Sequence, residues 1–142
     1  MALDREVQWK ISQKRDPEIE KQAQDWIEAV VGEKFPTGSS FGEALKDGII
    51  LCKLMNVLKP GSVTKMHTTG GPIKLRENIG LFQTAARAYG LDPSEVFQAV
   101  DLFDQQNLQQ VALCVHALGR LAQKNNFSGP KIATLKPPTI HD

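Results

Sequence analysis

The chain has 142 residues, of which 41% are apolar and 23% charged, proportions typical of one folded domain with a single core. Its net charge of +1 excludes the strongly basic composition of most nucleic-acid-binding domains, so we expect no nucleic-acid partner. Its two cysteines, Cys52 and Cys114, lie in apolar helical patterns, and we interpret them as reduced core residues of a cytosolic protein.

Two helices are predicted in the N-terminal part of the chain. The first lies in an extension over residues 1–15, where an aliphatic side chain recurs every fourth position. The second begins at Asp16 and Pro17, because an aspartate caps the free amides of a first helical turn and proline is favoured directly after it. An apolar stripe at helical spacing follows as far as Val31, and it includes Trp26 and Ile27, which we assign to the core.

The most apolar segment runs from Leu45 to Pro60. Apolar side chains surround nearly its whole circumference, which indicates a central helix with other helices packed on several sides. Asp47 can cap its first turn, and Pro60 prevents its continuation. At 16 residues the segment is too short to span a bilayer, and no integral membrane segment is expected. The core positions assigned here are Leu51, Leu54 and Leu58.

Two more amphipathic helices are predicted, one along the stripe from Leu75 to Tyr89 and one from Leu108 to Ala122. A short helix capped by Asp92 lies between them. Gly119 falls inside the last helix, where glycine costs stability relative to alanine, so we expect it to mark a close helix crossing. The core positions assigned to this half are Ile79, Phe82, Leu102, Phe103 and Leu118.

The predicted fold class is all-α, because no segment alternates polar and apolar residues as a strand does. One domain over residues 16–127 would hold about four main helices, with short connecting helices, around the buried central helix. Gly-Pro and Pro-Pro pairs after residue 127 predict a flexible tail over residues 128–142.

No set of side chains suggests catalysis, a metal site or a cofactor. The three histidines are far apart in the sequence, and Cys114 and His116 diverge by about 200 degrees around their helix. Both cysteines sit among aliphatic residues, whereas a nucleophilic thiolate needs an exposed, polar setting. The paired glycines before Pro72 lack the Gly-Lys-Ser/Thr ending of a phosphate-binding loop. We therefore expect a binding module rather than an enzyme.

Four motifs, in this order, resemble those of calponin-homology domains: Asp25-Trp26-Ile27, the Leu-x-Asp-Gly helix starting at Leu45, the Phe97–Phe103 segment, and Ala117-Leu118-Gly119-Arg120. Their spacing is similar to that in the calponin, transgelin and muscle-protein-20/myophilin group. The resemblance covers roughly residues 3–129 and is carried by the four motifs together.

The resemblance implies a cytoplasmic, cytoskeletal protein that binds, bundles or regulates actin filaments. The short basic repeats common in this group do not appear in the sequence, and strong actin binding through this fold usually needs two tandem domains. We therefore expect a monomer that binds actin weakly by itself. Two alternatives stay open, namely a signalling adaptor that docks a kinase or a small-GTPase regulator, and a microtubule-binding domain.

In related actin-binding domains, one contact region lies on the helix of the first tryptophan and another at the start of the later amphipathic helix. Carried over to this chain, the first region corresponds to Lys21, Gln22 and Gln24. The second corresponds to Lys74, Arg76, Glu77 and Asn78. The alternative for all seven residues is an ordinary solvated helix face.

Charge is distributed in blocks along the chain. Residues 16–47 contain eight acidic and three basic side chains, whereas residues 48–91 contain six basic and one acidic side chain. Residues 92–107 contain four acids and no base, and residues 108–141 contain four bases and no acid. The blocks predict either ion pairs between neighbouring helices or a basic face that attracts an acidic partner.

Overall fold

The computed structural model describes residues 15–133, and within this range all regular structure is helical. The helix expected inside residues 1–15 therefore lies outside the described part, except for its last position. The elements are α2 (Pro17–Val31), α3 (Phe41–Leu45), α4 (Ile49–Leu58), α5 (Gly71–Tyr89), the 3-10 helix η1 (Pro93–Glu95), α6 (Ala99–Phe103) and α7 (Leu108–Lys124).

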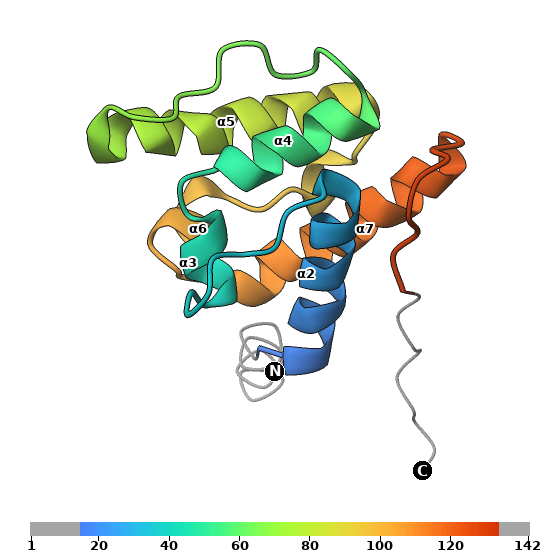
Figure 1. The fold of residues 1–142 in the computed structure, drawn as a ribbon, viewed down its shortest axis with the longest axis horizontal. Coiled ribbons are helices and arrows are strands. Elements are labelled where there is room, and N and C mark those ends of the chain that lie inside the picture. The colour runs from blue at the N-terminus through green and yellow to red at the C-terminus, as the bar shows by residue number, and fades with distance from the viewer. Residues whose placement is uncertain (1–14, 134–142) are drawn as a thin grey trace, which may run out of the picture.

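Two layers of helices enclose the core (Figure 1). Helices α4 and α5 lie side by side, and α2 packs against both α7 and α4. The short helices α3 and α6 contact each other and close one side, where α6 also meets α5. The predicted fold class, an all-α domain around a central helix, is confirmed.

The helix starts follow from local capping chemistry. The Asp16 carboxylate accepts a hydrogen bond from the Glu18 amide, and Pro17 occupies the first helical position of α2. Ser40 and Glu43 form a reciprocal capping box at the start of α3. The Asn107 side chain accepts a bond from the Gln110 amide at the start of α7. These caps orient each apolar stripe toward the shared interior.

Helix α4 is the buried centre of the domain. It begins at Ile49, whose amide donates to the Asp47 carboxylate at 3.0 Å. The intervening Gly48 has φ 72° and touches α5 so closely that an added Cβ would lie 2.7 Å from the Cβ of Asn78, so only glycine fits there. Leu51 and Leu54 are fully buried. The sequence predicts that neighbouring helices surround α4 on nearly every side, but Val57 faces solvent and is 41% exposed.

The assigned core positions are buried with one exception. Phe103, at the end of α6, is only half-buried and packs against the edge of the core. Its ring lies where α6 reaches the surface, and two cationic side chains stand over it. The buried positions are Trp26, Ile27, Leu51, Leu54, Leu58, Ile79, Phe82, Leu102 and Leu118.

The chain after α7 turns back onto the domain, which differs from the flexible tail expected from residue 128. We call residues 127–133 the C-terminal strap. Ile132 in the strap is 5% exposed, and the Pro130 carbonyl accepts a hydrogen bond of 2.9 Å from the Trp26 indole. Gly119 does mark a close approach, but its neighbour is Ile132 of the strap rather than another helix. Residues from 134 onward lie outside the described part.

Candidate protein-binding surface

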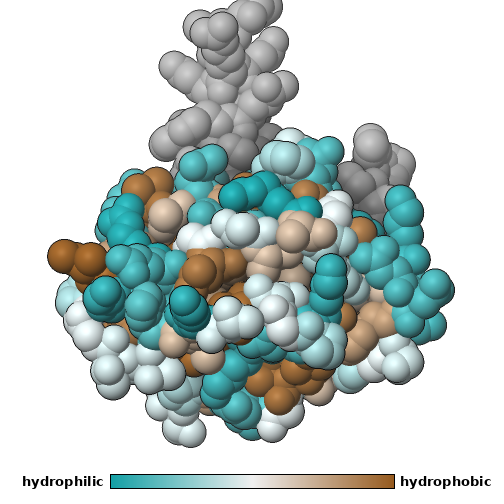
Figure 2. Space-filling model, turned by 90° about the horizontal axis from the view of Figure 1, so that it is seen from above, coloured by the Kyte–Doolittle hydropathy of each residue, from teal (hydrophilic) through white to brown (hydrophobic). Residues whose placement is uncertain are grey.

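The described residues offer exposed surfaces that could contact another protein. No cluster of three or more His, Cys, Asp or Glu side chains within residues 15–133 could hold a metal ion. Within the same residues, no helix combines the length and the apolar character needed to cross a membrane. Figure 2 shows hydrophilic side chains interleaved with small, separate apolar areas on the face that it presents.

The first turns of α5 present two free cations. Lys74 and Arg76 are exposed, and within residues 15–133 neither has a carboxylate oxygen within 4.0 Å. Helix α5 has no acidic residue in its first turn. Ile73, next to these cations, is 77% exposed. The start of α5 is therefore positively charged with a single protruding aliphatic side chain.

Phe103 extends this charged area onto α6. The Arg76 guanidinium carbon lies 5.0 Å from the centroid of the Phe103 ring. The Lys46 ammonium lies 5.3 Å from the same centroid and reaches it from the end of α3. Both distances are within the range of attraction between a cation and an aromatic face. We call Lys46, Lys74, Arg76 and Phe103 the basic surface.

Sequence reasoning did not identify Lys46 or Phe103 as members of this surface. The sequence indicates a core position for Phe103, because its neighbours are apolar. Lys46 belongs to a segment with an acidic balance, and 57 positions separate it from Phe103 in the sequence. Only the contact between α3 and α6 brings the two together. No pattern in the sequence carried that information.

Asn78 differs from the expectation of a surface residue, because its side chain is fully buried. Its amide nitrogen donates to the carbonyls of Asp47 at 2.9 Å and His67 at 2.6 Å. Its amide oxygen accepts a 2.8 Å bond from the His67 amide. Asn78 therefore fixes the connection before α5 against the start of α4, and it is not available to a partner.

Glu77 is exposed at the start of α5, as expected, but it is already paired. One of its carboxylate oxygens lies 2.9 Å from Nε2 of His67. Together with the bonds of Asn78, this contact holds His67 against the helix from two sides. Glu77 therefore contributes to the position of the preceding loop and offsets part of the positive charge nearby.

Each candidate residue on α2 forms an ion pair or a hydrogen bond with a side chain one turn away on the same helix. Lys21 pairs with Asp25 at 3.1 Å, Gln22 donates to Glu18, and Gln24 donates to Glu28. Such contacts at i,i+4 are ordinary features of a solvated helix. Figure 1 shows α2 well separated from the start of α5. The two candidate regions therefore do not form one continuous site.

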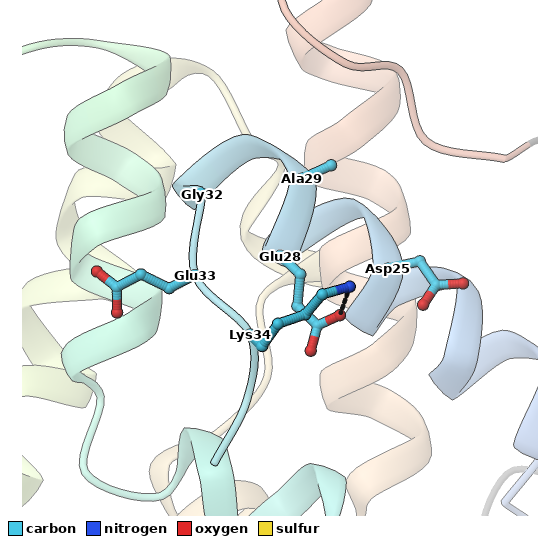
Figure 3. Close-up of a pocket in the computed structure, with 6 residues that line it drawn as sticks. All are labelled: Asp25, Glu28, Ala29, Gly32, Glu33 and Lys34. Carbon is cyan, nitrogen blue, oxygen red and sulfur yellow. Dashed lines mark ion pairs between the residues drawn. The ribbon is translucent and has the colours of Figure 1, made fainter. Parts of the chain in front are cut away.

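The end of α2 carries an acidic hollow of about 450 Å³. Figure 3 shows Lys34 turned toward Glu28, whereas Asp25 and Glu33 point away on opposite sides. The Lys34 ammonium lies 3.7 Å from the Glu28 carboxylate. Burial raises the pKa of Glu28, but hydrogen bonds from the Phe35 amide and the Gln24 side chain reverse this and hold it below its usual value. The carboxylate is thus satisfied within the domain.

Some charges of neighbouring blocks pair with each other, and others have no partner within the described residues. Lys53 pairs with Glu33 at 3.0 Å and Arg120 with Glu95 at 3.5 Å, so some charges do pair between blocks. Within residues 15–133, several bases of the 48–91 block have no acid within 4.0 Å and remain free to attract an acidic partner. These unpaired bases are Lys59, Lys65, Lys74, Arg76 and Arg87.

Comparison with known proteins identifies the family. Residues 17–124 match the family model described as the calponin homology (CH) domain. The chain is 48% identical over 131 residues to "Muscle-specific protein 20" of Drosophila melanogaster, covering 92% of this chain and 71% of that protein. It is 41% identical over 139 residues to "Myophilin" of Echinococcus granulosus, covering 94% and 73%.

Solved structures agree on the fold. The calponin-homology domain of Rng2 from Schizosaccharomyces pombe matches with a TM-score of 0.71 at 24% identity, over 87% of this chain and 79% of that one. The calponin-homology domain of an IQGAP protein from the same organism matches with a TM-score of 0.69 at 22% identity, over 83% and 74%. The chain belongs to the calponin-homology domain family, within its transgelin/calponin group, whose members are cytoskeleton-associated binding proteins rather than enzymes.

Proposed function

We propose that the chain binds actin filaments weakly, through the cations at the start of α5. The observation that carries this proposal is the pair Lys74 and Arg76, which are exposed and have no acidic partner within residues 15–133. Membership of the transgelin/calponin group supports a cytoskeletal partner, and the family resemblance makes the acidic surface of an actin filament the expected one.

The physical argument favours a weak, salt-sensitive interaction. One exposed charge pair contributes only about 0–1 kcal/mol, so several cations must act together. Salt reduces each contribution, because the screening length falls to about 10 Å at 0.1 M ionic strength. The Asn78 bonds supply rigidity, since a fixed loop and helix start lose little entropy when a partner docks.

The α2 region is the weaker candidate of the two. Its candidate side chains already donate to neighbouring acidic side chains, and a partner would have to replace those contacts. These side chains are Lys21, Gln22 and Gln24. We therefore place the main filament contact on α5. Any part played by α2 is expected to be secondary.

The test reverses both charges in Lys74→Glu/Arg76→Glu and measures co-sedimentation with actin filaments across a salt series. The matched control is Lys59→Glu/Lys65→Glu, which changes net charge equally at two exposed, unpaired lysines of the same block. We expect binding of the α5 variant to fall several-fold at low salt, while the control keeps most of its binding. Circular dichroism checks that the helices persist in both variants.

Three outcomes would contradict the proposal. Unchanged, salt-insensitive binding of the α5 variant would move the contact elsewhere, to the α2 helix first. Equal loss in both variants would mean that net charge, rather than the α5 start, governs binding. Absence of binding by the unmutated chain at low salt would favour the signalling-adaptor function, and parallel sedimentation with microtubules tests the remaining alternative.

A further inference from the structure

The C-terminal strap lies against both α2 and α7. Gly119 is the point of contact on α7, because an added Cβ there would lie 2.8 Å from the Cβ of Ile132 and closer still to its Cγ2 methyl. Trp26 on α2 supplies the polar contact, donating its indole N–H to the Pro130 carbonyl at 2.9 Å. The strap thus makes a directional hydrogen bond at Pro130 and an apolar contact at Ile132, two residues further along.

The strap is held at few points. Ile132 is 5% exposed, whereas Ser128, Pro130, Lys131 and Ala133 are all exposed. The first residue of the strap is held separately, because the Phe127 amide donates a hydrogen bond of 2.9 Å to the Ala122 carbonyl at the end of α7. Within the described residues, the buried Ile132 side chain and the bond from Trp26 to the Pro130 carbonyl hold the part of the strap after Gly129.

The strap also lies beyond the part of the chain that defines the family. The family match ends at residue 124, before the strap begins. Helices α2 and α7, which the strap contacts, also pack directly against each other. The strap therefore lies outside the residues that match the family model, although its Ile132 packs into the same core as the helices.

We propose that the surface of α2 and α7 around Trp26 and Gly119 is a binding seat for an extended peptide segment, and that the chain's own strap fills it in cis and can leave it. The recognised segment presents a branched aliphatic side chain two residues after the carbonyl that accepts from Trp26. Pro130-Lys131-Ile132 meets this description. When the strap leaves, the seat on Gly119 is open to a segment of the same chemistry.

Gly119→Ala tests whether the strap can be displaced, with Gly80→Ala as the matched control. Both replace a glycine inside a helix, where alanine is the better helix former. An added Cβ meets Ile132 at Gly119 but nothing within 4 Å at Gly80. The measurement is the rate at which trypsin cuts the Lys131–Ile132 bond, identified by mass, in the native full chain.

We expect Gly119→Ala to be cut at least several-fold faster than the unmutated chain, with unchanged helix content and no loss of resistance to urea. Gly80→Ala should be cut at the original rate. Equal rates in all three proteins would overturn the proposal. The proposal would also be overturned if Gly119→Ala were cut faster and unfolded at a lower urea concentration. Faster cutting would then reflect unfolding of the whole domain, and the strap would be a permanent part of the fold.

A second measurement tests binding in trans. In full-length Ile132→Ala the seat is empty, and the NMR signal of the Trp26 indole N–H, assigned with Trp9→Phe, should move. A synthetic peptide of residues 127–133 should return it toward its original position with saturation at or below the millimolar range, because a strap that is closed in cis has a dissociation constant below the millimolar effective concentration of a short tether. The double variant Gly119→Ala/Ile132→Ala should not respond. A linear or absent response in Ile132→Ala would contradict the proposed seat.

Discussion

The buried amide of Asn78 joins three parts of the chain with hydrogen bonds that use both of its donors and its oxygen. Asn78→Ala would leave carbonyls and an amide without partners, and each such loss costs about 1–3 kcal/mol. We expect a loss of at least this size in the free energy of unfolding, measured in urea. The control Asn125→Ala removes an exposed bond of 3.3 Å to the Tyr89 carbonyl and should change little. Equal effects would contradict the role of Asn78.

His116 is a second buried polar residue, between α7 and α2. Its Nε2 lies 3.0 Å from the Ile19 carbonyl, which can only accept, so Nε2 carries the proton. Nδ1 is buried without a partner within the described residues. Burial lowers the pKa of His116 below its usual value, and the charge of Arg120 lowers it further. The bond to the Ile19 carbonyl raises the pKa, but it does not outweigh these two effects.

The sign of the pH effect follows from this lowered pKa. The unfolded chain binds a proton at His116 more readily than the folded chain, so stability decreases as pH falls below the ordinary value of about 6.5. We expect the free energy of unfolding to decrease from pH 7 to pH 5 more steeply in the unmutated chain than in His116→Gln. Glutamine retains a donor for the Ile19 carbonyl. Parallel curves for the two proteins would contradict this assignment.

Both cysteine thiols are buried and free, as predicted. Burial raises the pKa of Cys52 to about 12, with a further contribution from Asp47. Burial likewise raises the pKa of Cys114 to about 12. Since only the thiolate reacts, we expect slow labelling by a thiol reagent at pH 8, with a rate that rises in urea as the domain opens. Fast labelling of both thiols in the native chain would contradict this.

At the scale of elements, α4 should dominate stability. Leu54 is fully buried, and Leu54→Ala should lower the free energy of unfolding by about 2–5 kcal/mol, as large-to-small core substitutions do. Val57→Ala on the same helix is the control, because Val57 is 41% exposed and alanine is the better helix former. A loss of only a few tenths at Leu54 would contradict the central position of α4.

Helix positions and core stripes were predictable because their causes are local. Capping by Asp16, Ser40 or Asn107 and apolar spacing act within a few turns of the chain. The burial of Asn78 also had a local signal, since it lies three residues after Leu75 and four before Phe82, on the apolar face of α5. Its bonds to His67 and Asp47 span 11 and 31 residues. The spacing of apolar residues along a helix does not predict hydrogen bonds between residues so far apart.

At the scale of the whole molecule, the candidate surface was predictable only in part. The excess of bases in residues 48–91 indicated a positive region, and Lys74 and Arg76 do lie exposed within it. The contribution of Lys46 and Phe103 depends on how α3, α5 and α6 meet. The docked strap was missed because Ile132 is a lone aliphatic residue among polar and proline residues, where sequence patterns indicate an unstructured tail.

The bond between Trp26 and Pro130 joins the first and last described segments across 104 positions of the chain. Tension applied to the two ends would therefore run along α2, through this bond and the seat of Ile132, into the strap. The layer of α4 and α5 lies outside that path (Figure 1). Pulling would first peel the strap and lengthen the chain by a few residues, while α5, which carries Lys74 and Arg76, stays unloaded.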